Sequence, residues 1–571
     1  MRNTILLLLL FFATQACSHQ VDNIPQPRDA ALARDTLITS PAYDLQFLST
    51  QLSNIQLASL VSSIGERYQN ITQFLGTKPK EKVLIKVFPS TEEKGLATRN
   101  TRPATLYFKE KQIHIVSNKY FPGEHQITFN QWFIRKALQV PATKPLEIGL
   151  AGVFAPNFIP MNYKTIAQSL AKSTNLPPLQ EVLDDELFEK ESPILMQICA
   201  AALVDFLLHK WGKTTFLERY RKWKPTANEL SDLNKEWRQF IIANYPDTNA
   251  KTAQLPDKLH GFNFAHEGYR IYNGYGSKLA KQSLDTLMKL GINAIAIVPY
   301  TFMRDRFKPS FFPLVNRAGS ETDESVILTH LQAKEKSLIT LLKPQIWVHG
   351  SWPGAIEMKS KQDWNLFFEY YYRWMRHYAL IAEIYHIDIL CLGVELSIAT
   401  TSHPEQWKTL IQKTRGIYHG KITYAANWGA EFEDFDFGHQ LDYIAINCYY
   451  PISQKKRADE EELRKGFQKI IKKIEQKSIR TERPVLITEI GFRSIQAPWI
   501  HPHEDYLGQP QTEKDQALCY QIVLEELEQY DWCKGIFWWK WPSYLDYMSD
   551  NRTGFSPNRK LAEKVFRQFH E

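Results

Sequence analysis

Short, nearly continuous apolar runs alternate with longer stretches of helical spacing from residue 258 to the end of the chain. Runs of this kind are typical of parallel strands whose outer faces are covered by helices. The predicted strands are 259–267, 292–300, 344–350, 387–395, 422–428, 442–450, 484–491 and 535–541. The predicted helices between them include 276–290, 322–342, 362–385, 404–417, 458–477 and 513–530. Eight strands alternating with helices over about 310 residues predict a (β/α)8 barrel, the TIM-barrel fold.

A doubly wound open sheet is the alternative fold for this half of the chain. Such a sheet usually carries a Gly-rich phosphate-binding loop after its first strand. The sequence has no such loop after residues 259–267, so the barrel is favoured.

The first half of the chain has a different pattern, in which helical stretches dominate. Residues 111–118 alternate apolar and polar positions and predict an edge strand, whereas 124–138 and 194–223 predict helices. A polar, Pro-flanked segment without periodicity, 244–261, marks a domain boundary. We therefore expect a linker at 17–40, a mainly helical α+β domain at 41–245, a second linker at 246–257 and the barrel at 258–571.

The N-terminus reads MRNTILLLLLFFATQACSHQ, which predicts a secretion signal over residues 1–16. The phrase TQAC resembles the lipobox of bacterial lipoproteins. This resemblance implies cleavage before Cys17, lipidation of Cys17 and a mature protein tethered to a membrane. Because Ser18 replaces the Asp that retains many lipoproteins at the inner membrane, we expect a cell-envelope lipoprotein of the outer membrane, facing the periplasm or the surface. The alternative is a plain signal peptide with an incidental cysteine.

Charge and cysteine content exclude several classes of function. The chain has 69 basic and 62 acidic side chains, a formal net charge of +7, without a basic stripe interleaved with aromatic residues, which disfavours nucleic-acid binding. The cysteines after Cys17 form no CxxC pair, so we predict buried thiols and no metal or cofactor, with a Cys519–Cys533 bridge left open.

Two glutamates end predicted strands of the barrel. Glu395 ends the fourth strand and Glu489 lies at the end of the seventh. Active-site residues of such barrels lie at the C-terminal ends of strands, and strands four and seven face each other across the mouth. Cleavage of a glycosidic bond needs such a pair, one carboxyl protonated and the other ionised. The structural alternatives are a helix cap for Glu395 and, for Glu489, an ion pair with Arg483 or Arg493.

Several phrases of this half resemble glycoside hydrolases of clan A, and most closely family 113. The matching phrases are GFNF, YGS, SLDTLMKLGINAIAIVP, LGVEL around Glu395, ITEIGF around Glu489, GIFWWKW and TGFSPNRKLAEKVF. Known members of that family are retaining β-mannanases, so the resemblance implies that Glu395 is the acid/base and Glu489 the nucleophile. Val394 stands where many clan members carry an Asn that binds the sugar 2-hydroxyl. Family 113 lacks that Asn, so Val394 favours the narrower assignment.

Further candidates for substrate binding lie at other strand ends, each with packing as the alternative explanation. Tyr449 is expected to hydrogen-bond the nucleophile and keep it ionised. Either Trp539 or Trp541 is expected to form the floor beneath the sugar ring. The weaker candidates are Asn427, Trp428, His349, Trp352 and Asn263.

The first half resembles the gluzincin metallopeptidases in the order of its elements. An edge strand, a helix in the position of HExxH, an EGLA-like phrase and a helix containing WGK follow one another. The zinc motif needs two histidines four residues apart with a Glu between them. Here His125 is present, but Gln126 and Phe129 replace the base and the second ligand, and Ile148 takes the place of the third, with Glu147 one residue out of register. We predict a non-catalytic relic without metal; the alternative is an unrelated helical domain.

These observations predict a membrane-tethered, retaining endo-β-glycosidase that acts on a β-linked polysaccharide or oligosaccharide, with β-mannan favoured. Glu395, its pKa raised by the nearby anion Glu489, is expected to act as the acid. Another β-linked glycan remains open as substrate, and so does a protein partner of the first domain. The alternative function is a non-catalytic glycan-binding or scaffold lipoprotein, against which the intact glutamate pair argues.

Overall fold

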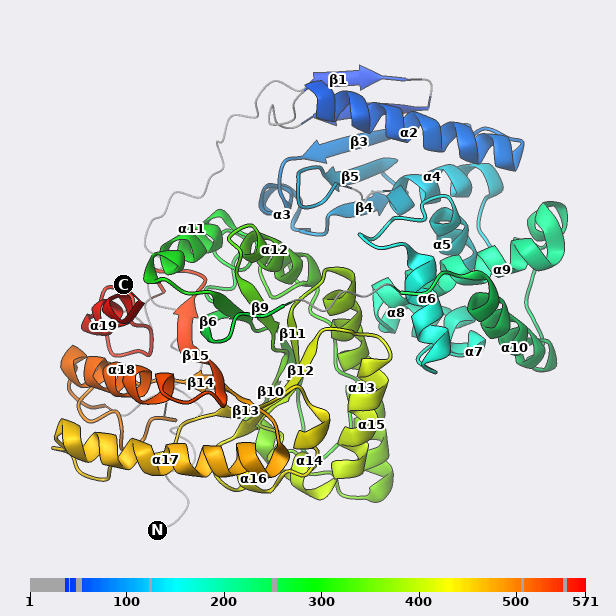
Figure 1. The fold of residues 1–571 in the computed structure, drawn as a ribbon. Helices are drawn as coiled ribbons and strands as arrows, with labels where there is room; N and C mark the ends of the chain where they lie inside the picture. Colours follow the sequence, from blue (N-terminus) through cyan, green and yellow to red (C-terminus); the bar gives the residue numbers. More distant parts are fainter. Residues whose placement is uncertain are drawn as a thin grey trace, which may run out of the picture.

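The structure is a computed structural model that describes residues 36–40, 42–47, 54–122, 126–248, 254–504, 508–547 and 552–570. Figure 1 shows two domains side by side, the first in blue to cyan and the second in green to red. The last helix of the first domain ends at Asn244 and the first barrel strand begins at Leu259, which brackets the predicted boundary. The predicted signal peptide and the lipidation site at Cys17 lie outside the described residues.

The first domain contains a five-stranded mixed sheet with strand order β1-β2-β3-β5-β4. The strands are β1 (Thr36–Thr39), β2 (Tyr43–Phe47), β3 (Val83–Phe88), β4 (Ala104–Tyr107) and β5 (Gln112–Val116). Thus the sheet begins inside the segment 17–40 that was expected to be a linker. The prediction of an edge strand at 111–118 was wrong, because β5 lies between β3 and β4 and β4 forms the edge. The polar residue His114 is itself buried, so the alternation of apolar and polar residues in this segment does not mean that one face of the strand is exposed to solvent.

The longest helix of the first domain is the apolar helix α9 (Pro193–Arg219). The others are α2 (Asn54–Leu75), α3 (Thr91–Thr98), α4 (Gln126–Leu138), α5 (Lys144–Val153), α6 (Tyr163–Lys172), α7 (Leu179–Leu183), α8 (Asp185–Lys190) and α10 (Ala227–Asn244). Glycines allow α5 to approach α9 closely, since a Cβ at Gly149 would collide with the Ala200 carbonyl. Within the described residues, α9 alone has the length and composition of a membrane span, but most of it is buried in this domain.

Eight parallel strands of the second domain close into a barrel, which confirms the predicted (β/α)8 fold. In chain order they are β6 (Leu259–Ala265), β7 (Ala294–Ile297), β9 (Ile339–Leu342), β11 (Ile389–Val394), β12 (Lys421–Asn427), β13 (Tyr443–Asn447), β14 (Val485–Ile490) and β15 (Cys533–Pro542). Small and branched side chains such as Ala294, Leu341 and Ala445 fill its interior.

Helices cover the outside of the barrel, as the alternating pattern predicted. They are α11 (Lys278–Leu287), α12 (Asp323–Lys334), α13 (Lys361–Ile384), α14 (Ser397–Ser402), α15 (Pro404–Arg415), α16 (Ala430–Asp434), α17 (Glu460–Thr481), α18 (Glu513–Glu528) and α19 (Leu561–His570). Short 3-10 turns are η1 (Met288–Leu290), η2 (Pro353–Ala355) and η3 (Gly438–Gln440).

The third barrel strand differs from the prediction. The barrel uses β9 (Ile339–Leu342), which falls inside the predicted helix 322–342. Residues of the predicted strand 344–350 instead form β10 (Gln345–Val348), which pairs in parallel with β8 (Tyr300–Met303) as a separate two-stranded sheet. The helix α12 ends at Lys334, and Ser337 then adopts the left-handed conformation with φ 59°, which reverses the chain into β9.

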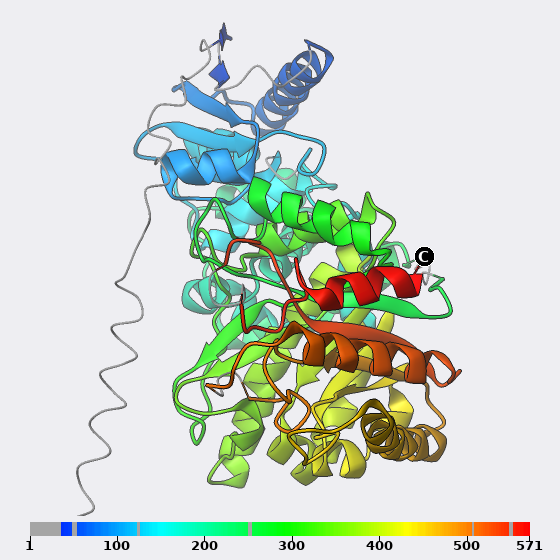
Figure 2. The ribbon, with the colours of Figure 1, turned by 90° about the vertical axis from the view of Figure 1, so that its left-hand side faces the viewer.

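The first domain is attached to the outer helices of the barrel. Glu191 accepts hydrogen bonds from Arg373 and Arg376 of α13. On α12, Glu324 accepts one from the Thr101 hydroxyl at 2.6 Å, and Glu335 accepts one from the Tyr120 hydroxyl at 2.7 Å. Figure 2, turned by 90°, shows the same arrangement, with the first domain resting on one side of the barrel.

Candidate active site

A cavity of about 410 Å³ opens at the C-terminal ends of the barrel strands, and both predicted glutamates line it. Glu395 follows β11 directly, and Glu489 is the penultimate residue of β14. The complete lining is Trp352, Glu395, Asn427, Trp428, Tyr449, Glu489, His503, Trp539 and Phe555. Strands four and seven therefore bring two carboxylates to one cavity, as the strand order predicted.

Glu395 is held between two neutral donors. Its Oε1 accepts a hydrogen bond from Asn447 Nδ2 at 2.8 Å, and its Oε2 accepts one from Trp352 Nε1 at 2.8 Å. Its backbone has φ 54°, a left-handed conformation that costs a non-Gly residue about 1 kcal/mol or more. The backbone N–H of Glu395 donates to Ala425 O at 2.9 Å, which fixes the turn by which the chain leaves β11.

Desolvation in the cavity and, after it, the negative charge of Glu489 together raise the pKa of Glu395 to about 7. The hydrogen bonds from Trp352 and Asn447 act in the opposite direction. Burial is therefore the larger cause of the raised pKa, and the neighbouring anion Glu489, the cause that was predicted from the sequence, is the second. A carboxyl group with this pKa can exist in both protonation states near neutral pH, as a proton donor and acceptor must.

Glu489 lies in an environment of the opposite kind. Its Oε1 accepts hydrogen bonds from Lys343 Nζ at 2.5 Å and from Gln345 Nε2 at 3.2 Å, and its Oε2 accepts one from the Tyr449 hydroxyl at 3.0 Å. The side chain of Lys343 is fully buried, and Glu489 is 8% exposed. Three donors, one of them a buried ammonium group, therefore hold the Glu489 carboxylate in place.

The barrel register explains how the two environments meet. Asn447 of β13 is the Cα partner of Glu489 on β14, and its side chain reaches across to Glu395. Thr488 Oγ1 donates to Asn447 Oδ1 at 3.1 Å, which orients the amide so that its Nδ2 points at Glu395. A carboxyl group with a raised pKa beside a second carboxylate that is held by three donors can serve as the acid of an acid and nucleophile pair.

Four of the weaker or alternative candidates line the same cavity, namely Asn427, Trp428, Trp352 and Trp539. Tyr449 lines it as well and contacts Glu489 as expected. Trp428 contacts His503 and Tyr450 through its ring, so this wall of the cavity is aromatic.

Three predicted residues lie elsewhere. Trp541 is fully buried and donates from Nε1 to Ser283 Oγ of α11 at 3.0 Å, because the register between β15 and β6 shifts between Trp538 and Trp541. Asn263 is buried inside the barrel, where Nδ2 donates to Thr488 O at 2.9 Å. His349 is exposed after β10, beside the Trp347 ring rather than in the cavity lining.

The structure also adds residues that were not predicted: Lys343, Gln345, Asn447, His503 and Phe555. Lys343 and Gln345 had a signal, since a lysine interrupts the apolar phrase LLKPQIW. Lys343 was not recognised as the residue after a barrel strand, because the residues of β9 were predicted to be the end of a helix. Asn447 lies two residues before Tyr449 at the end of β13, the same kind of strand end that pointed to both glutamates.

Phe129, Glu147 and Ile148, which were compared with a zinc site, pack against core side chains of the first domain. His125 lies outside the described residues, and Phe129 of α4 is fully buried. Ile148 packs on a small cluster of Phe188, Met196 and Ala200. Glu147 is buried and forms an ion pair with Arg135. The part of the chain that the structure describes contains no group of three or more His, Cys, Asp or Glu residues that could hold a metal ion.

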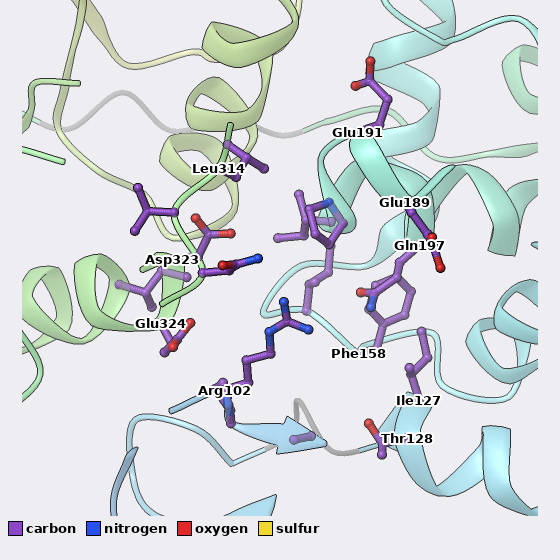
Figure 3. A pocket seen from close by; sticks show the side chains of 18 of the residues that line it. Arg102, Ile127, Thr128, Phe158, Glu189, Glu191, Gln197, Leu314, Asp323 and Glu324 are labelled. Carbon is purple, nitrogen blue, oxygen red and sulfur yellow. The ribbon is translucent and has the colours of Figure 1, made fainter. Parts of the chain in front are cut away.

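A second cavity of about 520 Å³ lies between the two domains (Figure 3). Arg102 points into it from the first domain, opposite Asp323 and Glu324 of α12. Its carboxylates have partners: Glu324 accepts from Thr101, Glu191 from two arginines, and Asp323 contacts His377 Nε2 at 2.9 Å. Glu324 and Glu191 hold the domains together, and Asp323 pairs within the barrel domain, so the cavity at the barrel mouth is the better candidate for catalysis.

One family model matches the part of the chain that contains the barrel. The family model described as Glycoside Hydrolase Family 113 matches residues 263–557, a range that includes Glu395 and Glu489. No curated protein matches the chain.

Similar solved structures cover about half of the chain. A family 113 β-mannanase from Alicyclobacillus acidocaldarius, in complex with ManMIm, has 22% sequence identity and a TM-score of 0.48, covering 55% of this chain and 96% of that chain. A structure of a family 113 β-1,4-mannanase in complex has 22% identity and a TM-score of 0.47, covering 55% and 98%. A β-glucuronidase from Ruminococcus gnavus has 15% identity and a TM-score of 0.40, covering 56% and 51%.

Proposed function

This chain belongs to glycoside hydrolase family 113, and from that premise we propose that it is a retaining endo-β-glycosidase with β-mannan as the favoured substrate. That it is a glycoside hydrolase follows from the family; the mechanism, mode of action and sugar are the proposal. One observation carries the mechanism. Two glutamates share a single cavity, one with a pKa raised to about 7 and the other paired with a buried lysine.

In the first step Glu489 attacks the anomeric carbon of the sugar. The bond between that carbon and the glycosidic oxygen breaks, and an ester bond to the Glu489 carboxylate forms in its place. Glu395 gives its proton to the departing oxygen, so the leaving group departs as a neutral alcohol. Lys343, Gln345 and Tyr449 hold the attacking carboxylate in position.

In the second step Glu395, now ionised, takes a proton from water. The water oxygen attacks the anomeric carbon, and the ester bond to Glu489 breaks, which regenerates both side chains. Two inversions at one carbon give net retention of configuration. Asn447 and Trp352 keep the Glu395 carboxyl in place for both steps, and Trp539 offers a ring on which the sugar can stack.

A panel of mannan, glucomannan, xylan, galactan and β-glucan tests this proposal with the parent and Glu395→Gln. We expect reducing ends to appear on mannan and glucomannan for the parent only, with long fragments early in the reaction. Proton NMR of the first products should show the β-anomer. An α-anomer as first product, or equal rates for parent and variant, would contradict the two-glutamate mechanism.

We also propose that the chain is tethered to the cell envelope through a lipid on Cys17, on the strength of the TQAC phrase. Cys17→Ser should move the protein from the membrane fraction to the soluble fraction without changing its activity on soluble glycan. A parent protein found wholly in the soluble fraction would exclude the anchor. For the first domain, we propose a metal-free peptidase relic that serves as a scaffold.

A further inference from the structure

The small sheet of β8 and β10 has one packed face and one open face. Thr301, Met303, Ile346 and Val348 are all buried, at 0–5% exposure. The residues that alternate with them, which include Phe302 and Trp347, point to the opposite face. Phe302 is 37% exposed and Trp347 is 51% exposed. The sheet therefore presents aromatic rings on a face that no other element covers completely.

The open face begins at the catalytic glutamate. Gln345 is on this face and donates to Glu489 Oε1, and its Cα partner is Tyr300. The hydrogen bond from Gln345 to Glu489, which lines the cavity, places this pair beside it. Phe302 and Trp347 are the next Cα pair on the same face, about 6.6 Å farther along the strands. Thus the rings extend outward from the point of cleavage.

The two rings form a platform. Their centroids are 5.1 Å apart with an interplanar angle of 20°, and His349 lies 6.0 Å from the Trp347 ring. Exposed large aromatic side chains in the described residues are Tyr269, Phe302, Trp347 and Trp352, and all four follow the first three barrel strands. The exposed aliphatic residues have no such grouping, since Val140, Leu366 and Ile479 lie on unrelated elements. Exposed aromatic surface concentrated beside a cavity indicates a binding surface.

We propose that Phe302 and Trp347 form a stacking subsite for a sugar ring of the glycan chain, outside the cavity in which the bond is cut. This subsite rests on the proposed glycosidase function. It implies that the substrate is a glycan chain longer than the cavity. A flat ring pair presents the apolar surface that the C–H face of a pyranose can cover. Because Gln345 contacts Glu489 and Trp347 lies two residues farther along the same face of β10, one polymer can reach from the cavity to the platform.

The experiment compares a polymer with a short substrate. Trp347→Ala and Phe302→Ala should each raise the KM for soluble glucomannan about five- to tenfold, with kcat unchanged. For the shortest β-linked oligosaccharide that the parent cleaves, kcat/KM should change less than about twofold. Trp347→Phe keeps a ring and should recover most of the affinity for the polymer. Ile479→Ala, which removes a 71% exposed side chain from α17, is the matched control and should change neither substrate.

Equal losses on polymer and oligosaccharide would indicate a structural defect and would overturn the subsite. Unchanged KM for the polymer in both alanine variants would overturn it as well. A parent without activity on any glycan would instead reject the proposed function. In that case electrophoresis in gels that contain glucomannan still tests the platform. Retardation of the parent that is lost in Trp347→Ala supports it, and no retardation of the parent rejects it.

Discussion

Each domain buries a glutamate against a cation, and the two pairs differ in what surrounds them. In the first domain Glu147 of α5 binds Arg135 of α4, so the pair ties two helices together. In the barrel Glu489 binds Lys343, but Glu489 also faces a cavity that it shares with a second carboxylate. A buried ion pair is weak evidence for function by itself. It becomes a candidate for chemistry where a cavity and a second titratable group are added.

The surroundings of the two glutamates also differ in polarity. Burial raises the pKa of Glu147, Arg135 opposes this shift, and the nearby Tyr220 is a core residue. Glu489 receives three hydrogen bonds from Lys343, Gln345 and Tyr449. The comparison predicts that substitutions in the barrel pair will lower turnover, whereas substitutions in the first-domain pair will lower stability and leave turnover unchanged.

The largest effect is expected from removing either glutamate of the barrel pair. Glu489→Ala and Glu395→Ala should each lower kcat by at least about a thousandfold, because each removes a group that forms or breaks a bond. Glu147→Gln, the corresponding change in the first domain, should leave kcat within about twofold while lowering the melting temperature. Initial rates on glucomannan measure the first effect and thermal unfolding the second. Parental turnover in Glu489→Ala would contradict the comparison.

The next effect concerns the cations. Lys343→Met should lower kcat roughly a hundredfold, since it leaves a carboxylate buried without its counter-charge and misplaces the nucleophile. Arg135→Met should leave kcat unchanged and lower the free energy of unfolding by about 2 kcal/mol. Kinetics and urea denaturation of both variants distinguish the two roles. Equal loss of kcat in both would show that the variants are merely unstable.

A smaller effect is expected in the dependence of activity on pH. Because Glu395 must carry a proton in the first step and its pKa is about 7, kcat/KM should fall as the pH rises through about 7. Asn447→Ala removes a hydrogen bond that lowers this pKa, so the alkaline limb should move to higher pH. The raised pKa also means that Glu395 favours the folded state at low pH and that this contribution is lost as the pH rises through about 7. A limb that stays in place in Asn447→Ala would argue against Glu395 as the titrating group.

The smallest effect is expected from metal removal. Treatment with EDTA should leave both kcat and the melting temperature unchanged, because the zinc-like positions Phe129 and Ile148 are apolar and packed. Metal analysis of protein purified without added metal provides the check. Stoichiometric zinc in the purified protein would contradict the relic hypothesis for the first domain.

The sequence predicted the barrel and its glutamate pair because both depend on strong local patterns. Long apolar runs identify parallel strands, and a carboxylate at the end of such a run is conspicuous, as at Glu395. The third strand was missed because its four residues, ITLL, continue the apolar spacing of α12 and the reversal at Ser337 has no Gly or Pro. With the strand, Lys343 was missed too.

Other errors came from tertiary features that a single sequence does not carry. Side chains two residues apart on a strand normally share a face, so Trp541 was expected on the same face as Trp539. A register shift in β15 instead directs Trp541 toward α11, where it contacts Ser283. The local pattern also could not show that β10 pairs with β8 outside the barrel and leaves Trp347 exposed. Both outcomes depend on pairing with neighbouring strands rather than on local residue preference.

The most direct test is to trap the glycosyl-enzyme bond in the native protein. With a 2-deoxy-2-fluoroglycosyl fluoride of β-configuration, the Glu489 carboxylate should attack the anomeric carbon and release fluoride ion. The ester that forms between the sugar and Glu489 should then hydrolyse slowly. Peptide mass spectrometry should then find one sugar on the peptide that contains Glu489, and no sugar in Glu489→Gln. A labelled peptide from any other part of the chain would contradict the proposed roles of the pair.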